Sequence, residues 1–186
     1  WGDAPLSYGD ASHEIPRSLQ TLFLGSRLVF DSPDAESGSQ PSTAADGDDT
    51  SGRDDENGVA FRTDSSNQSV TATATVNNNS GVGSPLLCGW LDVNGNGAFE
   101  TAERRCVILA PGTNAYTLEW AALSTGQPVT TYARFRVGTD GAIVALPTGS
   151  TSDGEVEDYP VAWDFPAEDF GDTPADGASI PGGTAA

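Results

Sequence analysis

The sequence contains no lysine and only one histidine, so its positive charge depends on eight arginine residues. Against them stand 27 acidic residues, which give a formal net charge of -19 at pH 7. Nucleic acid is a poor partner for such a chain, because its phosphates would be repelled. An anionic membrane surface is a poor partner for the same reason unless a divalent cation bridges the two.

Long apolar runs are also missing, because no stretch reaches the ~18 residues that a membrane-spanning helix needs. No signal peptide is present, and the chain begins abruptly at Trp1, so we expect a mature or excised part of a larger protein. Its 186 residues suit one domain with extra segments or two small domains. Hydrophobic residues make up 37%, but they cluster in short runs that can build a core.

The residues of common catalytic motifs are scarce. The single histidine, His13, lies between Ser12 and Glu14, where we predict a loop and a surface or capping role rather than a general base. No Gly-x-Ser-x-Gly motif occurs. Carboxylates are plentiful, so counting alone leaves a glycosidase-like pair open. The sequence nevertheless favours a protein that is not an enzyme.

The apolar runs have the length and alternation of β-strands. Val and Ala alternate with Ser and Thr over residues 69–76, and residues 77–81 are predicted to form a turn. About seven such runs separated by turn signals predict an all-β fold, an antiparallel immunoglobulin-like β-sandwich. The predicted strands cover residues 59–62, 69–76, 86–91, 105–109, 116–120, 130–137 and 156–163.

Three parts of the chain differ in composition. Residues 1–58 form an acidic, loop-rich segment predicted to pack on the sandwich; its apolar island at 22–30 is either a strand or a short helical turn. Residues 59–163 form the sandwich. Residues 164–186 are predicted to be a linker, the start of the next repeat or a docking tail, because residues 170–174 repeat the aromatic-Gly-Asp-x-Pro pattern of residues 1–5. Coincidence is the alternative explanation for so short a match.

Residues 92–103 fit the calcium-loop pattern D-x-[DN]-x-[DN]-G-x5-E without a mismatch. Calcium prefers six to eight hard oxygen ligands, and alternate residues of a tight loop can point inward together. The flanking runs indicate strands, so we expect the loop without its usual helices. A plain Asx-rich hairpin turn is the alternative. The predicted ligands are Asp92, Asn94, Asn96, the carbonyl of Ala98, and Glu103.

The only two cysteines, Cys88 and Cys106, flank this loop and form no Cys-x-x-Cys motif. In an exported protein such a pair indicates one disulfide, which would clamp the ends of the loop. Two buried free thiols are the alternative.

A second group of acidic residues is dense enough to require cations or full solvation. One or more further calcium sites, pinning the N-terminal segment to the sandwich, would explain it; a solvated surface loop is the alternative. The residues are Asp46, Asp48, Asp49, Asp54, Asp55 and Glu56 in the N-terminal segment, and Glu155, Glu157 and Asp158 just before the last predicted strand.

Several segments of the chain, taken in order, resemble the GEVED domain, a repeated module of large secreted bacterial proteins. Residues 154–159 read Gly-Glu-Val-Glu-Asp-Tyr, and residues 89–97, 132–136 and the opening residues 1–9 also resemble the family. The family usually has Asp where Asn96 stands, which lowers the expected calcium affinity.

The resemblance implies a β-sandwich in cell-surface, adhesin-like or matrix proteins, and hence a secreted or cell-surface location. We therefore expect a calcium-binding structural module of a repetitive surface or fibre protein whose partners are neighbouring copies of itself. The alternative is an adhesin module that binds a glycan or a surface protein. Trp90 and Trp120 lie in apolar runs, which indicates core positions rather than a sugar-binding platform.

Overall fold

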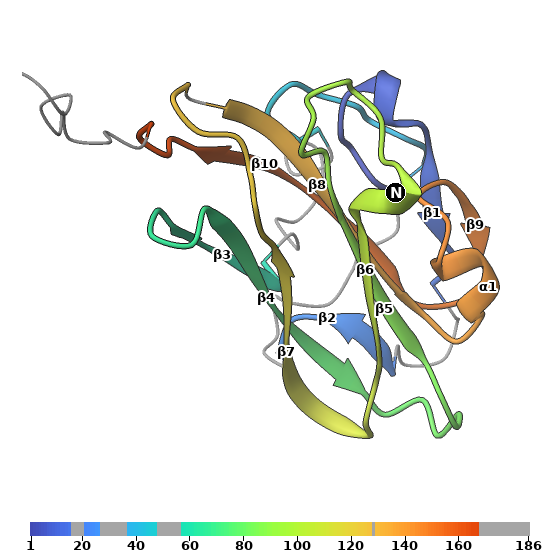
Figure 1. Cartoon of the computed structure of the whole chain (residues 1–186). Coiled ribbons are helices and arrows are strands. Elements are labelled where there is room, and N and C mark those ends of the chain that lie inside the picture. The colour runs from blue at the N-terminus through green and yellow to red at the C-terminus, as the bar shows by residue number, and fades with distance from the viewer. Residues whose placement is uncertain (16–20, 27–36, 48–56, 128, 168–186) are drawn as a thin grey trace, which may run out of the picture.

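The computed structural model describes residues 1–15, 21–26, 37–47, 57–127 and 129–167. Two antiparallel sheets pack face to face, and a smaller layer covers the outer face of one of them (Figure 1). The all-β, antiparallel prediction is confirmed. The first sheet contains β2 (Leu22–Leu24), β3 (Val59–Asp64), β4 (Ser69–Asn78) and β7 (Gly112–Trp120). The second has the order β10 (Glu155–Trp163), β8 (Val129–Gly138), β5 (Leu86–Leu91) and β6 (Arg104–Ile108).

All seven predicted strands are present, but only β5 has the predicted bounds at both ends, and β7 begins at Gly112 rather than at residue 116. β4 continues through Asn78, where a turn was predicted, because Asn77 and Asn78 pair with β2 on one side and β7 on the other. β10 begins at Glu155, so the acidic residues predicted to precede this strand lie within it. The apolar island provides β2, which settles the choice between strand and helical turn for residues 22–24.

The main core lies between the two sheets. On β4 the apolar residues Val70, Ala72, Ala74 and Val76 are fully buried, whereas the threonines between them are more exposed, as the alternation predicts. Phe135 from the opposite sheet meets Trp120 edge to face at 6.4 Å between ring centroids. Full burial of one such aromatic or aliphatic side chain contributes about 1.5–3 kcal/mol, so this layer holds the sandwich together.

A third layer covers the outer face of the second sheet and encloses a separate small core (Figure 1). It contains η1 (Leu6–Tyr8), β1 (Ala11–His13), α1 (Gly141–Val144) and β9 (Gly149–Thr151), and β1 pairs with β9 in parallel. The predicted core positions of Trp90 and Trp120 are confirmed, but they fall in different cores. Trp90 packs in this outer core, whose buried members are Ala4, Tyr8, Cys88, Trp90, Phe99 and Val144.

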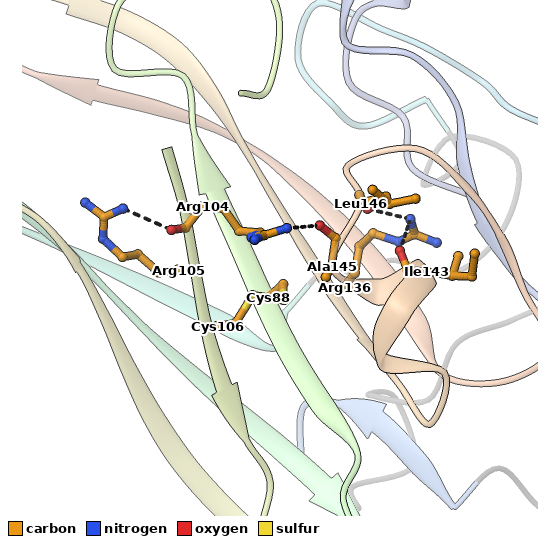
Figure 2. The surroundings of a disulfide bond; sticks show 8 residues. All are labelled: Cys88, Arg104, Arg105, Cys106, Arg136, Ile143, Ala145 and Leu146. Carbon is orange, nitrogen blue, oxygen red and sulfur yellow. Dashed lines mark hydrogen bonds between the residues drawn. A yellow bond between two sulfur atoms is a disulfide. The ribbon is translucent and has the colours of Figure 1, made fainter. Parts of the chain in front are cut away.

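The predicted disulfide joins Cys88 and Cys106, which lie directly opposite each other on β5 and β6 (Figure 2). Cys88 is fully buried beneath the third layer, whereas Cys106 is exposed on the edge strand. The bond closes the base of the hairpin that carries residues 92–103. Within the described residues, no helix is long and apolar enough to cross a membrane.

Replacing both cysteines with alanine is expected to destabilise the protein by about 3 kcal/mol, because the unfolded chain regains the freedom of a loop of this size. Urea unfolding of the variant and of the oxidised wild type measures the difference. Equal midpoints for the two would contradict a stabilising role for the bond.

Candidate functional site

The predicted calcium loop, residues 92–103, connects β5 to β6, and its flanks are strands as expected. Asp92 has no solvent exposure, and its carboxylate is surrounded by backbone N–H groups of the loop. Its Oδ1 accepts from Gly95 N–H at 2.7 Å and from Asn96 N–H at 3.2 Å, and its Oδ2 accepts from Gly97 N–H at 2.9 Å. The first residue of the motif therefore organises the turn around its own carboxylate.

The two asparagines of the motif continue the same pattern. Asn94 Oδ1 accepts from the Asn96 N–H at 2.9 Å, and Asn96 Oδ1 accepts from the Ala98 N–H at 2.9 Å. The side-chain amide of Asn94 donates to Glu100 Oε2 at 2.8 Å. The side-chain oxygens of Asn94 and Asn96 thus lie in consecutive turns of one short loop, where each accepts a backbone N–H two residues further along.

Glu103 closes the loop from the other end, in η2 (Thr101–Glu103), and is buried. Its Oε1 accepts from the Val93 N–H at 2.9 Å, and its Oε2 accepts from the Glu100 N–H at 3.0 Å. Burial raises the pKa of this carboxyl, although the backbone N–H groups oppose that shift. Glu103 therefore holds its carboxylate among backbone N–H groups at the twelfth position of the motif.

The loop carries three carboxylates, and the nearby arginines do not neutralise them. Arg104 donates to the carbonyl of Ala145, and Arg105 donates to the carbonyl of Arg104 (Figure 2). Arg105 also donates to the carbonyls of Glu119 and Ala102. Among the described residues, no group of three or more His, Cys, Asp or Glu side chains lies close enough together to hold a metal ion. A cation here would therefore depend on asparagine and backbone oxygens as well as carboxylates.

Tyr8, which the motif analysis missed, links this loop to the N-terminal layer. Its hydroxyl donates to Asp92 Oδ2 at 2.8 Å, and its ring packs on Phe99 at 4.5 Å between centroids. Burial is the main cause that raises the pKa of Tyr8 to about 12, so the hydroxyl keeps its proton. The loop and the first turn of the chain are consequently one packed unit.

The second acidic group is described only in part. Five of its residues lie outside the described part of the chain: Asp48, Asp49, Asp54, Asp55 and Glu56. Asp46 Oδ1 accepts from the Ser42 hydroxyl at 2.7 Å. Next to it, Gly47 N–H donates to Asp3 Oδ2 at 2.7 Å, so this segment is attached to the N-terminal layer.

The carboxylates of β10 are buried, and they bind backbone N–H groups of the N-terminal segment. Glu155 Oε2 accepts from the Leu24 N–H at 2.5 Å, and Glu157 Oε1 accepts from the Gly58 N–H at 3.2 Å. Asp158 Oδ2 accepts from the Ala4 N–H at 2.8 Å. Three acidic residues of one strand thus attach the chain at three separate points. That calcium pins this segment to the sandwich stays a prediction.

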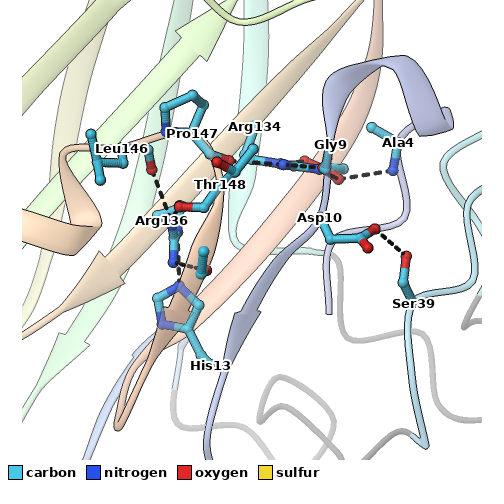
Figure 3. Close-up of polar contacts among 12 residues, drawn as sticks. Ala4, Gly9, Asp10, His13, Ser39, Arg134, Arg136, Leu146, Pro147 and Thr148 are labelled. Atoms are coloured by element: carbon cyan, nitrogen blue, oxygen red, sulfur yellow. Dashed lines mark hydrogen bonds and ion pairs between the residues drawn. The ribbon is translucent and has the colours of Figure 1, made fainter.

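Asp158 also forms a fully buried ion pair with Arg134 of β8, in two parallel contacts of 2.7 Å each. The same guanidinium donates to the carbonyls of Gly9 and Pro147 at 2.8 Å (Figure 3). Arg134 therefore joins the sheet, the N-terminal turn and the segment after α1.

Arg136, two residues further along β8, lies on the same face and forms no ion pair with a carboxylate of the described residues. Its guanidinium donates to the carbonyls of Leu146, Thr148 and Gly149 and to His13 Nε2 (Figure 3). Burial, followed by the charge of Arg134, lowers its pKa to about 10. Two arginines at alternate positions around Phe135 were the available sequence signal for this layer.

The predicted loop position of His13 is wrong, because the residue ends β1 and its ring lies inside the third layer. Nε2 accepts from Arg136 Nε at 3.1 Å, and Nδ1 lies 2.7 Å from the Asp153 carbonyl. A carbonyl only accepts, so Nδ1 carries the proton and the ring is neutral. Burial, followed by the charge of Arg136, lowers the pKa of His13 to about 3.

Comparison with protein-family models finds the GEVED domain over residues 86–162, which confirms the predicted resemblance for that part of the chain. The matched residues include the loop, the disulfide and the acidic start of β10. Comparisons with curated proteins and with solved structures give no match.

Proposed function

We propose that this chain is a calcium-binding structural module of a repetitive extracellular bacterial surface or fibre protein. The GEVED match suggests a domain of an extracellular protein. The observation that supports the calcium role is the loop of residues 92–103, which combines a complete ligand motif with carboxylates that no arginine in the described residues neutralises. The disulfide at the base of the loop suits an oxidising compartment.

In this proposal calcium takes oxygens from Asp92, Asn94, Asn96, the Ala98 carbonyl and Glu103. The loop already curves in the required sense, since Gly95 and Gly97 have positive φ values of 68° and 78°. Bound calcium neutralises charge and holds the two ends of the loop together. Tyr8 transmits this order to the N-terminal layer through its bond to Asp92. Cations at the second acidic group would act in the same way.

The proposal of an array rests on the sequence repeat alone, because residues 170–174 lie outside the part of the chain that the structure describes. A following copy, or a docking tail on a neighbouring subunit, would place modules in series. Calcium would stiffen each module of such an array. Neighbouring copies of the chain are accordingly the proposed partners.

An adhesin role has weaker support. Trp90, Trp120 and Trp163 are all at most 3% exposed, whereas Trp1 is 39% exposed. A sugar-binding platform usually needs exposed aromatic rings. The burial of three tryptophans therefore favours the structural role.

Removing calcium is expected to lower the melting temperature of the protein. Saturating calcium at about a hundredfold excess over the dissociation constant stabilises the folded state by about 2.7 kcal/mol. Differential scanning calorimetry in calcium and in excess chelator measures the shift, with Asn94→Ala expected to reduce it. Asn67→Ala, in the exposed turn between β3 and β4, is the matched control and keeps the full shift. Identical melting temperatures of the wild type in the two buffers would refute the proposed calcium role.

A further inference from the structure

Three Asn-Gly dipeptides occur in the sequence, at residues 57–58, 94–95 and 96–97. In each, the glycine N–H donates to a carboxylate that is buried in the fold. Glu157 is 1% exposed and Asp92 is 0% exposed. The distances are 3.2 Å from Gly58 to Glu157 Oε1, 2.7 Å from Gly95 to Asp92 Oδ1 and 2.9 Å from Gly97 to Asp92 Oδ2.

Asn-Gly is chemically fragile. The glycine nitrogen loses its proton and attacks Cγ of the asparagine side chain; the new N–Cγ bond closes a succinimide, and the Cγ–Nδ2 bond breaks to release ammonia. Water then opens the ring at either carbonyl and leaves aspartate or isoaspartate. Glycine permits this attack most readily because it has no Cβ to obstruct the approach.

The backbone prevents the simple remedy of replacing these glycines. Gly95 and Gly97 have φ values of 68° and 78°, in the left-handed region that glycine adopts without strain. A Cβ on Gly58 would lie 2.6 Å from Leu24 Cβ and 2.7 Å from Gly25 N. Since the fold requires glycine after each asparagine, protection against the reaction has to come from the surroundings.

We propose that Asp92 and Glu157 protect the three Asn-Gly dipeptides from succinimide formation, and that Asn57, Asn94 and Asn96 become modification sites where this protection is lost. The attacking species is the deprotonated glycine nitrogen. A carboxylate that accepts the glycine N–H holds the proton in place and repels the developing negative charge, more strongly in a buried site than in water.

Hydrogen bonds also restrict the rotation of the two asparagine side chains in the loop. Asn94 bonds to Glu100 through Nδ2 and to the Asn96 N–H through Oδ1. Asn96 Oδ1 accepts from Ala98 N–H. Ring closure at either asparagine must break these bonds as well as the contact to Asp92. The inference concerns the loop without metal and does not rest on the proposed calcium role.

Peptide mapping by mass spectrometry tests the inference on the full chain, incubated in chelator at mildly alkaline pH. We expect the folded wild type to deamidate at all three sites at least about tenfold more slowly than the same chain in urea, a difference of about 1.4 kcal/mol in barrier. Equal rates in the two conditions would overturn the inference without the use of any variant.

Two variants separate carboxylate protection from general rigidity. Asp92→Ala is expected to accelerate the reaction at Asn94 and Asn96 but not at Asn57, and Glu157→Ala only at Asn57. The control, Asp64→Ala, removes a partly exposed carboxylate that accepts from Ser66 N–H, and it should change none of the three rates. Folding of each variant is followed by circular dichroism. Folded variants with wild-type rates at every site would contradict the proposal. A variant that unfolds is replaced by Asp92→Asn or Glu157→Gln, which keep the size of the side chain and remove its charge, and the same site-specific acceleration is expected.

Discussion

Replacing Asp158 with asparagine is expected to destabilise the protein by about 3–5 kcal/mol, because the substitution leaves the Arg134 guanidinium buried without its counter-charge. Both side chains are fully buried, and their two contacts are 2.7 Å long. Asp158 also accepts from Ala4 N–H, so the N-terminal turn loses an anchor at the same time. Urea unfolding monitored by tryptophan fluorescence measures the change.

The matched control is Asp64→Asn, which alters a partly exposed carboxylate at the end of β3. It should leave the unfolding midpoint almost unchanged. An Asp158→Asn midpoint close to that of the control would mean that the ion pair contributes little and that the third layer is held mainly by its apolar core.

Acidification is expected to destabilise the protein through His13, in addition to any effect of the carboxylates. The pKa of His13 falls from 6.5 to about 3 on folding, so the unfolded state binds the proton more readily. Its contribution to stability is complete above pH 6.5 and is lost as the pH falls towards 3. The slope over this window approaches about 1.4 kcal/mol per pH unit. A charged ring would lie against the Arg136 guanidinium and would give up its acceptor role.

Unfolding free energies of the wild type and of His13→Gln between pH 7 and pH 4 isolate this contribution, since glutamine does not titrate. The wild type should lose stability relative to the variant as the pH falls. Parallel curves for the two proteins would show that His13 does not titrate between the folded and unfolded states in this range.

The sandwich was predictable because its strands follow a simple physical rule. One face of β4 is packed against the core, so Val and Ala had to alternate with Thr, and the sequence shows this alternation directly. The disulfide was predictable for a similar reason, since two cysteines on either side of one hairpin have few other partners. The alternation depends only on neighbouring residues of one strand, and the disulfide depends only on the pairing of two adjacent strands.

The third layer could not be predicted, because polar groups hold it together across long sequence separations. Arg134 meets the Gly9 carbonyl 125 residues away, and Arg136 meets His13 across 123 residues. No hydrophobic period marks such contacts, and buried arginines resemble surface arginines in a sequence. For the same reason His13 was assigned to a loop.

The acidic start of β10 shows the limit of charge density as a sequence signal. Like charges close together suggested a cation site, yet Glu155, Glu157 and Asp158 meet backbone N–H groups and an arginine. Backbone donors leave no trace in a sequence, so a carboxylate that binds them cannot be told from a metal ligand by composition. Whether cations join these residues to the acidic segment at 48–56 stays a prediction.

The central claim is that residues 92–103 bind calcium, and isothermal titration calorimetry of the full chain tests it most directly. We expect calcium to bind the wild type, in the ~10⁻⁴–10⁻³ M range typical of extracellular modules, and to bind Asn94→Ala more weakly. Asn67→Ala should bind as the wild type does. Calcium binding that is absent from the wild type, or unchanged in Asn94→Ala, would contradict the account.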